Sequence, residues 1–318
     1  MSLLDRLHLP APAGGAASLS DATFHELRAF IYERTGLYFR DNKRYLLENR
    51  LGRRLAALGL PDFEAYLALL RGAGARAEAD ALFNAVTINE TYFFRHADQH
   101  ALFVGHLLPE LIEERLRRGQ RRVRLWSAAC STGDEPYTLA LLIRETLRTR
   151  YPHVAFEILG TDLNTDVLAH ARRGFFSSYA VRNVPPALLR QYFQAHGDGP
   201  NRTYELDRRV RSMVTFQTLN LVDPAGMARM RDVDAAFCAN VLIYFDDEAK
   251  RQVAGHLYHA LRDGGYLFVG VSETLYGVTQ SFQPTRFAQA VAYRKPPSTT
   301  TSALQTPQGS PSPALRHV

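Results

Sequence analysis

The sequence predicts an α/β protein, with a doubly wound sheet that follows an all-helical domain and carries a small antiparallel insert. Three observations support this. From about Arg121 onward, short apolar runs alternate with helical stretches, whereas the pattern from Ser20 to about His100 is helical throughout. One connection in the sheet region is also longer than a crossover needs. We therefore expect a helical domain over 19–95 and a sheet domain over 96–295, with the insert at about 176–215.

The helical domain is predicted from its start and stop signals and its periodicity. The segment SDATFHELRAFIYERTG offers Ser20 or Asp21 as a helix cap and Gly36 as a stop. Three further helical segments follow: DNKRYLLENRLGRRLAALGL, DFEAYLALL and EADALFNAVTI. In the first of these, four leucines return to one helical sector and predict its buried face: Leu47, Leu51, Leu55 and Leu58.

A basic stripe runs beside those leucines. It comprises Lys43, Arg50, Arg53 and Arg54, and the spacings of seven and four residues place most of these side chains on one adjoining sector. Two interpretations remain open, a solvated helix face and a docking surface for an acidic partner. We take these four residues as candidate substrate-docking residues.

The sheet is predicted from short runs of the kind found in buried parallel strands. These runs are RVRLWSA, FEILGTD, VTFQTLNL, VDAAFCANVLIYF and GGYLFVGVSE, and RFAQAVAYRK adds a late alternating strand. The long connection, of about forty residues, lies between HARRG and VTFQT. Within it, NRTYELDRRVRSMVTF alternates as a hairpin would.

Composition limits the class of protein. The chain has 318 residues, a net charge of +6 and only two cysteines, each in an apolar segment, which indicates reduced, buried thiols. There is no apolar run long enough to cross a membrane and no signal-peptide pattern, so we expect a cytoplasmic protein without membrane insertion. We also expect a monomer. The Ala/Gly/Pro-rich start (1–18) and the Ser/Thr/Pro-rich tail (296–318) are predicted to be disordered. The basic charge fits nucleic acid, an acidic protein surface or simple solubility.

Polar residues follow each of the first four predicted strands at its carboxyl end, where such sheets bind ligands. They are Asp134, Glu135, Asp162, Asn220 and Asn240. An acid after the second strand commonly binds the two ribose hydroxyls of a nucleoside. For Asp162 a second interpretation is open, because Asp162 or Asn164 could equally cap the next helix.

The first turn, ACSTGDEP, decides between ligands. A dinucleotide or phosphate loop would present several glycines to an anion, and this turn has one glycine and two acids. Pro136 suits the first position of the helix, which places Asp134 or Glu135 in the cap region. Two acids and a small-residue turn favour a nucleoside whose other end is cationic. S-adenosylmethionine has this structure, so the sequence predicts a methyltransferase.

Four segments in register carry a family resemblance. In order and spacing, from about residue 20 to 295, they resemble the signature segments of the CheR family, the chemotaxis protein-glutamate O-methyltransferases. The segments are NETYFFR (89–95), WSAACSTGDEPYTLALL (126–142), GTDLNTDVLAHARRGFF (160–176) and ANVLIYF (239–245). Asp134 departs slightly from the pattern, since many members have glutamate there.

The resemblance implies a role for each matched residue. Glu135 matches the contact to the methionine part of the cofactor, and Asp162 matches the ribose acid. Arg95 and Tyr244 match positions at the reacting centre, where we expect Arg95 to orient the incoming carboxylate and Tyr244 to border it. Arg95 is also an implied cofactor-binding residue. The others are Asn89, Thr91, Asn220, Leu221, Asn240 and Val241.

The implied substrate is a glutamate on the cytoplasmic helices of methyl-accepting chemoreceptors. Such a glutamate is already ionised at neutral pH, its pKa being about 4.3, so no general base is expected. No metal is expected either, because His96 and His100 share a helix face without an obvious set of carboxylate partners. Two alternatives stay open: a methyltransferase acting on another acceptor, and a non-enzymatic basic module that binds nucleic acid or a receptor scaffold. We expect no nucleic-acid partner.

Overall fold

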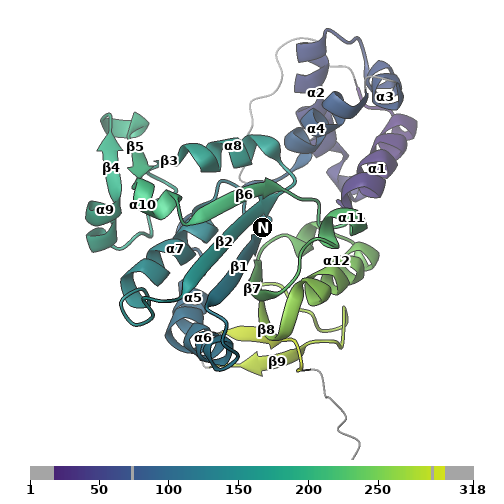
Figure 1. Ribbon diagram of the computed structural model, residues 1–318. Helices are drawn as coiled ribbons and strands as arrows, with labels where there is room; N and C mark the ends of the chain where they lie inside the picture. The colour runs from purple at the N-terminus through teal and green to yellow at the C-terminus, as the bar shows by residue number, and fades with distance from the viewer. Residues whose placement is uncertain (1–17, 73–74, 288–289, 298–318) are drawn as a thin grey trace, which may run out of the picture.

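The computed structural model describes residues 18–72, 75–287 and 290–297 of the chain. Figure 1 shows a helical domain at one end of a twisted sheet, helices on both faces of that sheet, and a small β-subdomain set apart from it. The disorder expected for 1–18 and 296–318 falls almost wholly outside the described residues.

The helical domain contains the four helices that the sequence predicts. They are α1 (Asp21–Thr35), α2 (Arg44–Leu58), preceded by the short turn η2 (Asp41–Lys43), α3 (Phe63–Arg71) and α4 (Ala75–Val86). The Ser20 side chain caps α1 by accepting a hydrogen bond from the Thr23 amide, and Gly36 ends the helix at φ 70°. Leu47, Leu51 and Leu55 are buried, whereas Leu58, expected on the same buried face, is 39% exposed.

A seven-stranded sheet forms the main domain, in the order β6-β2-β1-β7-β8-β10-β9. Its first five strands in that order are parallel, and the last two are antiparallel additions. The strands are β1 (Arg122–Ala128), β2 (Ala155–Asp162), β6 (Val214–Thr218), β7 (Val233–Cys238), β8 (Leu261–Val269), β9 (Gln283–Arg286) and β10 (Val291–Arg294). The strand order reverses beside β1, whose neighbours are β2 and β7, and ligands of such sheets bind at this reversal.

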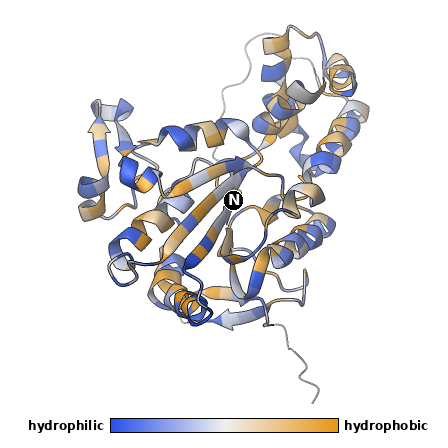
Figure 2. Cartoon of the chain, viewed as in Figure 1, coloured by the Kyte–Doolittle hydropathy of each residue, from blue (hydrophilic) through white to orange (hydrophobic). Residues whose placement is uncertain are grey.

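Helices cover both faces of the sheet because successive strand residues point to opposite sides. On β1, Leu125 packs into one apolar cluster with α6 and α7, and Trp126 packs into the other with α12. Figure 2 shows hydrophobic residues along the central strands and a mixture of both kinds around the outer helices. The helices of this domain are α5 (Ala97–Leu102), η3 (Phe103–Leu107), α6 (Leu108–Arg117), α7 (Asp134–Thr146), α8 (Thr165–Arg173), α11 (Pro224–Met227), η5 (Leu242–Tyr244) and α12 (Asp247–Ala260).

The insert is antiparallel, as predicted, but its strands pair differently. Its sheet has the order β3-β5-β4. The elements are β3 (Phe175–Ser177), α9 (Pro186–Tyr192), β4 (Phe193–His196), η4 (Gly199–Asn201), β5 (Thr203–Leu206) and α10 (Arg208–Arg211). The predicted hairpin within NRTYELDRRVRSMVTF is wrong, because α10 separates β5 from β6, and β6 joins the main sheet. The Asp207 side chain starts this helical turn by accepting from the Arg209 amide.

The end of the sheet domain also differs from the sequence prediction. The segment RFAQAVAYRK was expected to form one strand. Instead β9 ends at Arg286 and β10 begins at Val291, and the two strands pair antiparallel as a hairpin. Alternation of apolar residues continues across the turn in the sequence, which explains why the pattern alone does not reveal the break.

The helical domain contacts the sheet domain at two places. The Asn84 side chain at the end of α4 donates to Thr165 Oγ1 at 2.9 Å and accepts from the Thr165 amide at 3.0 Å. Beyond α1, Leu37 forms an isolated bridge with Phe245. The helical domain therefore lies over the carboxyl ends of the strands, where a ligand site is expected.

Candidate active site

A cavity of about 960 Å³ opens where the strand order reverses. Its wall includes the linker between the two domains, the turn after β1, the end of β2 and the loops after β6 and β7. Leu37, Tyr38 and Phe39 of the helical domain also line it. The residues proposed for the reacting centre and the cofactor all line this one cavity: Asn89, Thr91, Arg95, Glu135, Asp162, Asn220, Leu221, Asn240, Val241 and Tyr244.

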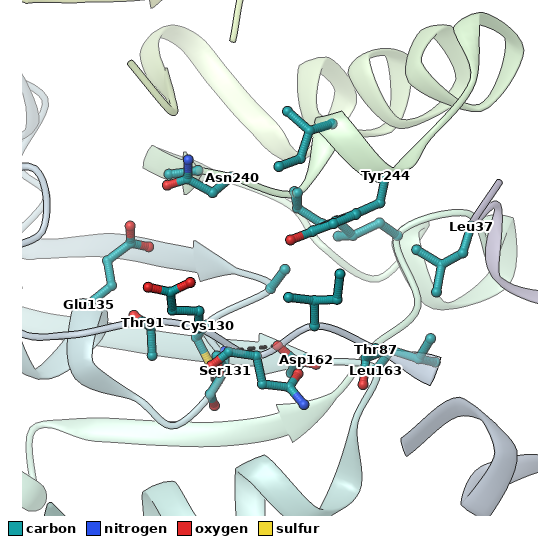
Figure 3. A pocket seen from close by; sticks show the side chains of 18 of the residues that line it. Leu37, Thr87, Thr91, Cys130, Ser131, Glu135, Asp162, Leu163, Asn240 and Tyr244 are labelled. Carbon is teal, nitrogen blue, oxygen red and sulfur yellow. Dashed lines mark hydrogen bonds between the residues drawn. The ribbon is translucent and has the colours of Figure 1, made fainter. Parts of the chain in front are cut away.

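Asp162 ends β2 and is held by backbone amides. One carboxylate oxygen accepts from the Ser131 amide at 2.8 Å, shown as a dashed line in Figure 3, and the other accepts from the Asn164 amide at 2.9 Å. The cap of α8 is Asn164, whose side chain accepts from the amides of Asp166 and Val167. Asp162 is therefore not needed as a helix cap, and burial raises the pKa of its carboxyl group.

The turn between β1 and α7 is tight and strained. Ala129 and Ser131 have φ values of 59° and 51°, in the left-handed region that most side chains avoid. Gly133, at φ 90°, is the N-cap, and α7 begins at Asp134. The expectation that Pro136 takes the first helical position is therefore wrong, since the helix starts two residues earlier. Strain of this kind concentrates at functional sites.

The two acids of the turn face different surroundings. Asp134 is fully buried, and Thr132 donates to one of its oxygens at 2.6 Å, while the other, Oδ1, has no hydrogen-bond partner among the described residues. Glu135 lines the cavity and accepts from the Ser127 hydroxyl at 2.6 Å. Burial raises the pKa of Glu135 to about 7 and that of Asp134 to about 6. A cation in the cavity would stabilise the ionised form of Glu135.

The linker NETYFFR lines the cavity except at Phe93 and Phe94, which are buried in the core. Phe93 is fully buried and packs against Phe176 at 4.8 Å between ring centroids. Phe94 adopts φ 57°, and its amide donates to Thr138 Oγ1 at the start of α7. This geometry turns Arg95 towards the cavity, where its guanidinium group donates to the Glu90 carbonyl at 2.5 Å.

The loop after β7 forms another part of the wall. Asn240 adopts φ 63°, and its side-chain oxygen lies 2.8 Å from His96 Nε2. Tyr244 lines the cavity, and burial raises the pKa of its hydroxyl group. In Figure 3, Tyr244 and Asn240 lie across the cavity from Asp162, and Leu37 stands beside Tyr244.

The part of the cavity where we expect the adenine of the cofactor to bind is mainly apolar. Leu221 is buried and Asn220 lies next to it after β6, but the Asn220 side chain already donates to the Arg34 carbonyl at 2.5 Å. Leu163, Leu219 and Val241 line the same cavity. These side chains offer the flat apolar contacts that a nucleobase requires.

The basic stripe is not one surface. Arg54 forms a two-pronged ion pair with Glu78, at 3.0 and 2.5 Å, inside the helical domain. Arg50 lines the cavity and donates to the carbonyls of Val86 and Thr87. Lys43 belongs to the turn before α2, and Arg53 is exposed. Arg54 therefore cannot serve as a free docking residue, a fact that the spacing of the stripe does not reveal.

Two histidines, His96 and His100, lie at the site. His96 bonds to Asn240, and His100 is buried against the cavity with no partner for either ring nitrogen among the described residues. Burial lowers the pKa of His100 to about 3, so it stays neutral. Within the described ranges, no group of three or more His, Cys, Asp or Glu side chains is arranged to hold a metal ion. Glu273, in the segment after β8, has no sequence signal of its own.

These features define a class of protein. The acid after β2, the single-glycine turn with an acid on the cavity wall, and the apolar far end together fit S-adenosylmethionine rather than a pyrophosphate cofactor. Asp162 would bind the ribose and Glu135 the cationic methionine part. The fold and site are those of an S-adenosylmethionine-dependent methyltransferase.

Comparison with known families narrows the class. Residues 89–291 match the family model "CheR methyltransferase, SAM binding domain", and residues 22–87 match "CheR methyltransferase, all-alpha domain". The chain belongs to the CheR methyltransferase family.

Curated relatives agree over most of their length. The chain is 35% identical to "Chemotaxis protein methyltransferase 2" of Vibrio cholerae over 278 residues, covering 87% of this chain and 94% of the relative. It is 36% identical to "Chemotaxis protein methyltransferase" of Escherichia coli over 270 residues, with 83% and 88% covered. For "Chemotaxis protein methyltransferase 1" of Pseudomonas aeruginosa the identity is 34% over 283 residues, with 87% and 99% covered.

The structure also bears on the state of the cysteines and on membrane spans. Both cysteines, Cys130 and Cys238, are free and buried, as predicted. No helix in the described part of the chain is long and apolar enough to span a membrane.

Proposed function

We propose that the protein transfers the methyl group of S-adenosylmethionine to glutamate side chains on the cytoplasmic helices of chemoreceptors. The observation that supports this most strongly is the convergence of two acids, Glu135 and Asp162, and one arginine, Arg95, on the same cavity. The acids suit a cationic nucleoside, and the arginine suits an incoming carboxylate. We propose that the protein acts in the cytoplasm as a monomer, and that it needs neither a metal nor nucleic acid.

The proposed roles follow from position. Asp162 holds the ribose, while Glu135 and the polar groups of Asn89 and Thr91 hold the methionine part. Leu221 and Val241 contact the base, with Asn220 and Asn240 framing it. When bound, the cofactor supplies an electrophilic methyl group on a sulfonium.

The chain's own contribution to the reaction is alignment and exclusion of water. Arg95 turns the acceptor carboxylate towards the methyl group from one side, so that the attacking oxygen keeps its electron pair free. Tyr244 and Leu37 close the cavity around the acceptor. Charge cancels as the new C–O bond forms, so a cavity that excludes water favours the reaction.

The acceptor side of the cavity has basic residues from the helical domain. Arg50 lines the cavity, and Lys43 and Arg53 lie on the same domain outside it. We propose that these three residues attract the acidic receptor helix, and that Arg54 does not take part because Glu78 holds it.

The test uses methyl-labelled S-adenosylmethionine and membranes that carry the chemoreceptors. Wild-type protein should label the receptor, and base should release the label as methanol, as expected of a methyl ester. Arg95→Ala should lower kcat about 100-fold because the carboxylate is no longer oriented, and Arg95→Lys, which keeps the charge but not the planar fork, should restore only part of it. A labelled product that is stable to base would mean another acceptor.

A further inference from the structure

Glu273 lies outside the cavity, directly behind the loop that carries two of its wall residues. It follows β8 and is half-buried. Three backbone amides donate to its carboxylate. The amides of Asn240 and Gly270 both donate to Oε2 at 2.7 Å, and the Ile243 amide donates to Oε1 at 3.2 Å.

Those bonds fix the backbone of the loop after β7. Asn240 has φ 63°, a conformation that costs a non-glycine residue about 1 kcal/mol. Its side chain is oriented by His96. Ile243 lies in η5, the turn that ends at Tyr244. One carboxylate therefore holds both the strained residue and the turn that positions the tyrosine. Hydrogen bonds to an ionised acceptor are the stronger kind.

The close approach depends on a glycine. A Cβ atom at Gly270 would lie 2.7 Å from Glu273 Oε2 and 2.9 Å from the Asn240 amide nitrogen. Both distances are shorter than real Cβ contacts, and the Asn240 contact is to backbone. An alanine at 270 would therefore push the carboxylate away from the amides that it binds.

We propose that Glu273 is a positioning residue for methyl transfer, which holds Asn240 and Tyr244 in their working geometry without touching cofactor or substrate. The activity test of this proposal rests on the proposed function. A second test measures ligand affinity and needs no acceptor. Glu273 has no role in the sequence motifs, because its partners are backbone amides of a distant segment.

The decisive variant is Glu273→Gln, which keeps the size of the side chain but turns an amide NH₂ group towards a backbone donor. Binding of S-adenosylhomocysteine is measured by calorimetry, and the stoichiometry gives the concentration of competent sites. Per competent site, we expect kcat for receptor methylation to fall at least tenfold. The dissociation constant should rise about tenfold, as expected for a lost hydrogen bond to a charged group.

Three variants complete the test. Gly270→Ala should reproduce the loss, and the double variant should lose little more than either single one, because both act on the same contact. Glu273→Asp, one methylene shorter, should have a kcat and a dissociation constant between those of wild type and Glu273→Gln. This variant replaces Glu273→Gln in the test if the glutamine variant does not fold. Asp62→Asn is the matched control, since Asp62 also accepts from a backbone amide but caps α3 far from the cavity. It should keep wild-type values per competent site.

The proposal fails if Glu273→Gln keeps both kcat per competent site and affinity within twofold of wild type. It also fails if Asp62→Asn loses as much, or if the losses in the double variant simply add. If wild-type protein binds S-adenosylhomocysteine but labels no receptor, the proposed function fails, and the affinity measurements still decide the role of Glu273.

Discussion

Asp134 and Glu135 are neighbours in the sequence and have different surroundings in the structure. Asp134 is enclosed beneath the turn, whereas Glu135 faces the cavity with one hydroxyl donor, from Ser127. Adjacent residues of a helix are rotated by about 100° around its axis, which separates the two side chains. This difference explains why the second acid, and not the first, is suited to a cationic ligand.

Glu135 gives a prediction for the dependence of binding on pH. Burial raises its pKa from 4.5 to about 7, so without ligand the ionised form costs stability increasingly as pH rises through that window. A cationic ligand binds the ionised form, so affinity for S-adenosylmethionine should increase with pH. We expect binding about tenfold weaker at pH 6 than at pH 8, where the group is mostly ionised.

Calorimetric titrations between pH 6 and 8 check this prediction, with Glu135→Gln as the control. That variant should bind more weakly at pH 8 and should change little over the range. Burial lowers the pKa of His100 to about 3, so this histidine gains no proton in this range, and burial also lowers the pKa of His96. An equally steep pH dependence in Glu135→Gln would show that another group is responsible.

The matched motifs gave ten proposed cofactor and reacting-centre residues, and all ten line one cavity. The partners that side chains acquire when the chain folds could not be predicted from the sequence. The ion pair that occupies Arg54 joins α2 to Glu78 of α4, and the three amides on Glu273 come from two loops. Neither contact leaves a local pattern in the sequence.

At the scale of elements, the turn between β1 and α7 sets the geometry of the site. Gly133 permits it in two ways. Its φ of 90° disfavours any side chain, and a Cβ atom there would lie 2.9 Å from the Ala171 Cβ atom and 3.1 Å from Phe216. The turn thus brings α7 close to α8 and β6, which places Glu135 and Asp162 on the same cavity.

We expect Gly133→Ala to lower the free energy of unfolding by about 2 kcal/mol, from the left-handed conformation and the added contact together. Urea unfolding measures this. Gly255→Ala in α12 is the control, because nothing lies within 4 Å of its Cβ position, and alanine there should stabilise by about 0.5–1 kcal/mol. Equal stability of both variants would contradict this account of the turn.

Element types were predictable and strand pairing was not. Ser20, the N-cap of α1, was one of two candidates in the sequence, and Gly36, its C-cap, was evident there. The pairing of β5 with β3 and β4 was not, because alternation specifies a strand without specifying its neighbour. Nor was the short helix α10 evident, because the alternation in the sequence continues through it.

At the scale of the whole molecule, the two ends of the sheet have different tasks. The carboxyl ends hold the cavity. At the opposite end, Asp234 is fully buried near the start of β7 and accepts from Arg115 Nε at 2.8 Å, from Arg262 and from the Arg124 amide. This cluster ties α6, β1, β7 and β8 together.

Asp234→Ala should therefore destabilise the protein by about 3 kcal/mol, because two buried guanidinium groups each lose one carboxylate partner. Arg115 keeps Asp232, and Arg262 keeps Glu114. The folded fraction should bind S-adenosylhomocysteine with wild-type affinity, since the cluster lies at the far end of the strands from Asn240. Urea unfolding and calorimetry on the same samples separate the two effects. Loss of affinity with unchanged stability would contradict the division of tasks.

The central claim is that acids at the carboxyl ends of the sheet bind a positively charged nucleoside in this cavity. Calorimetric titration of the purified protein with S-adenosylmethionine tests it most directly, with Asp162→Ala alongside. We predict one bound molecule per chain in the wild type and an affinity about 100-fold lower in Asp162→Ala, which removes the proposed contacts to both ribose hydroxyls. No binding by the wild type, or displacement by a pyrophosphate dinucleotide that binds more tightly, would contradict the claim.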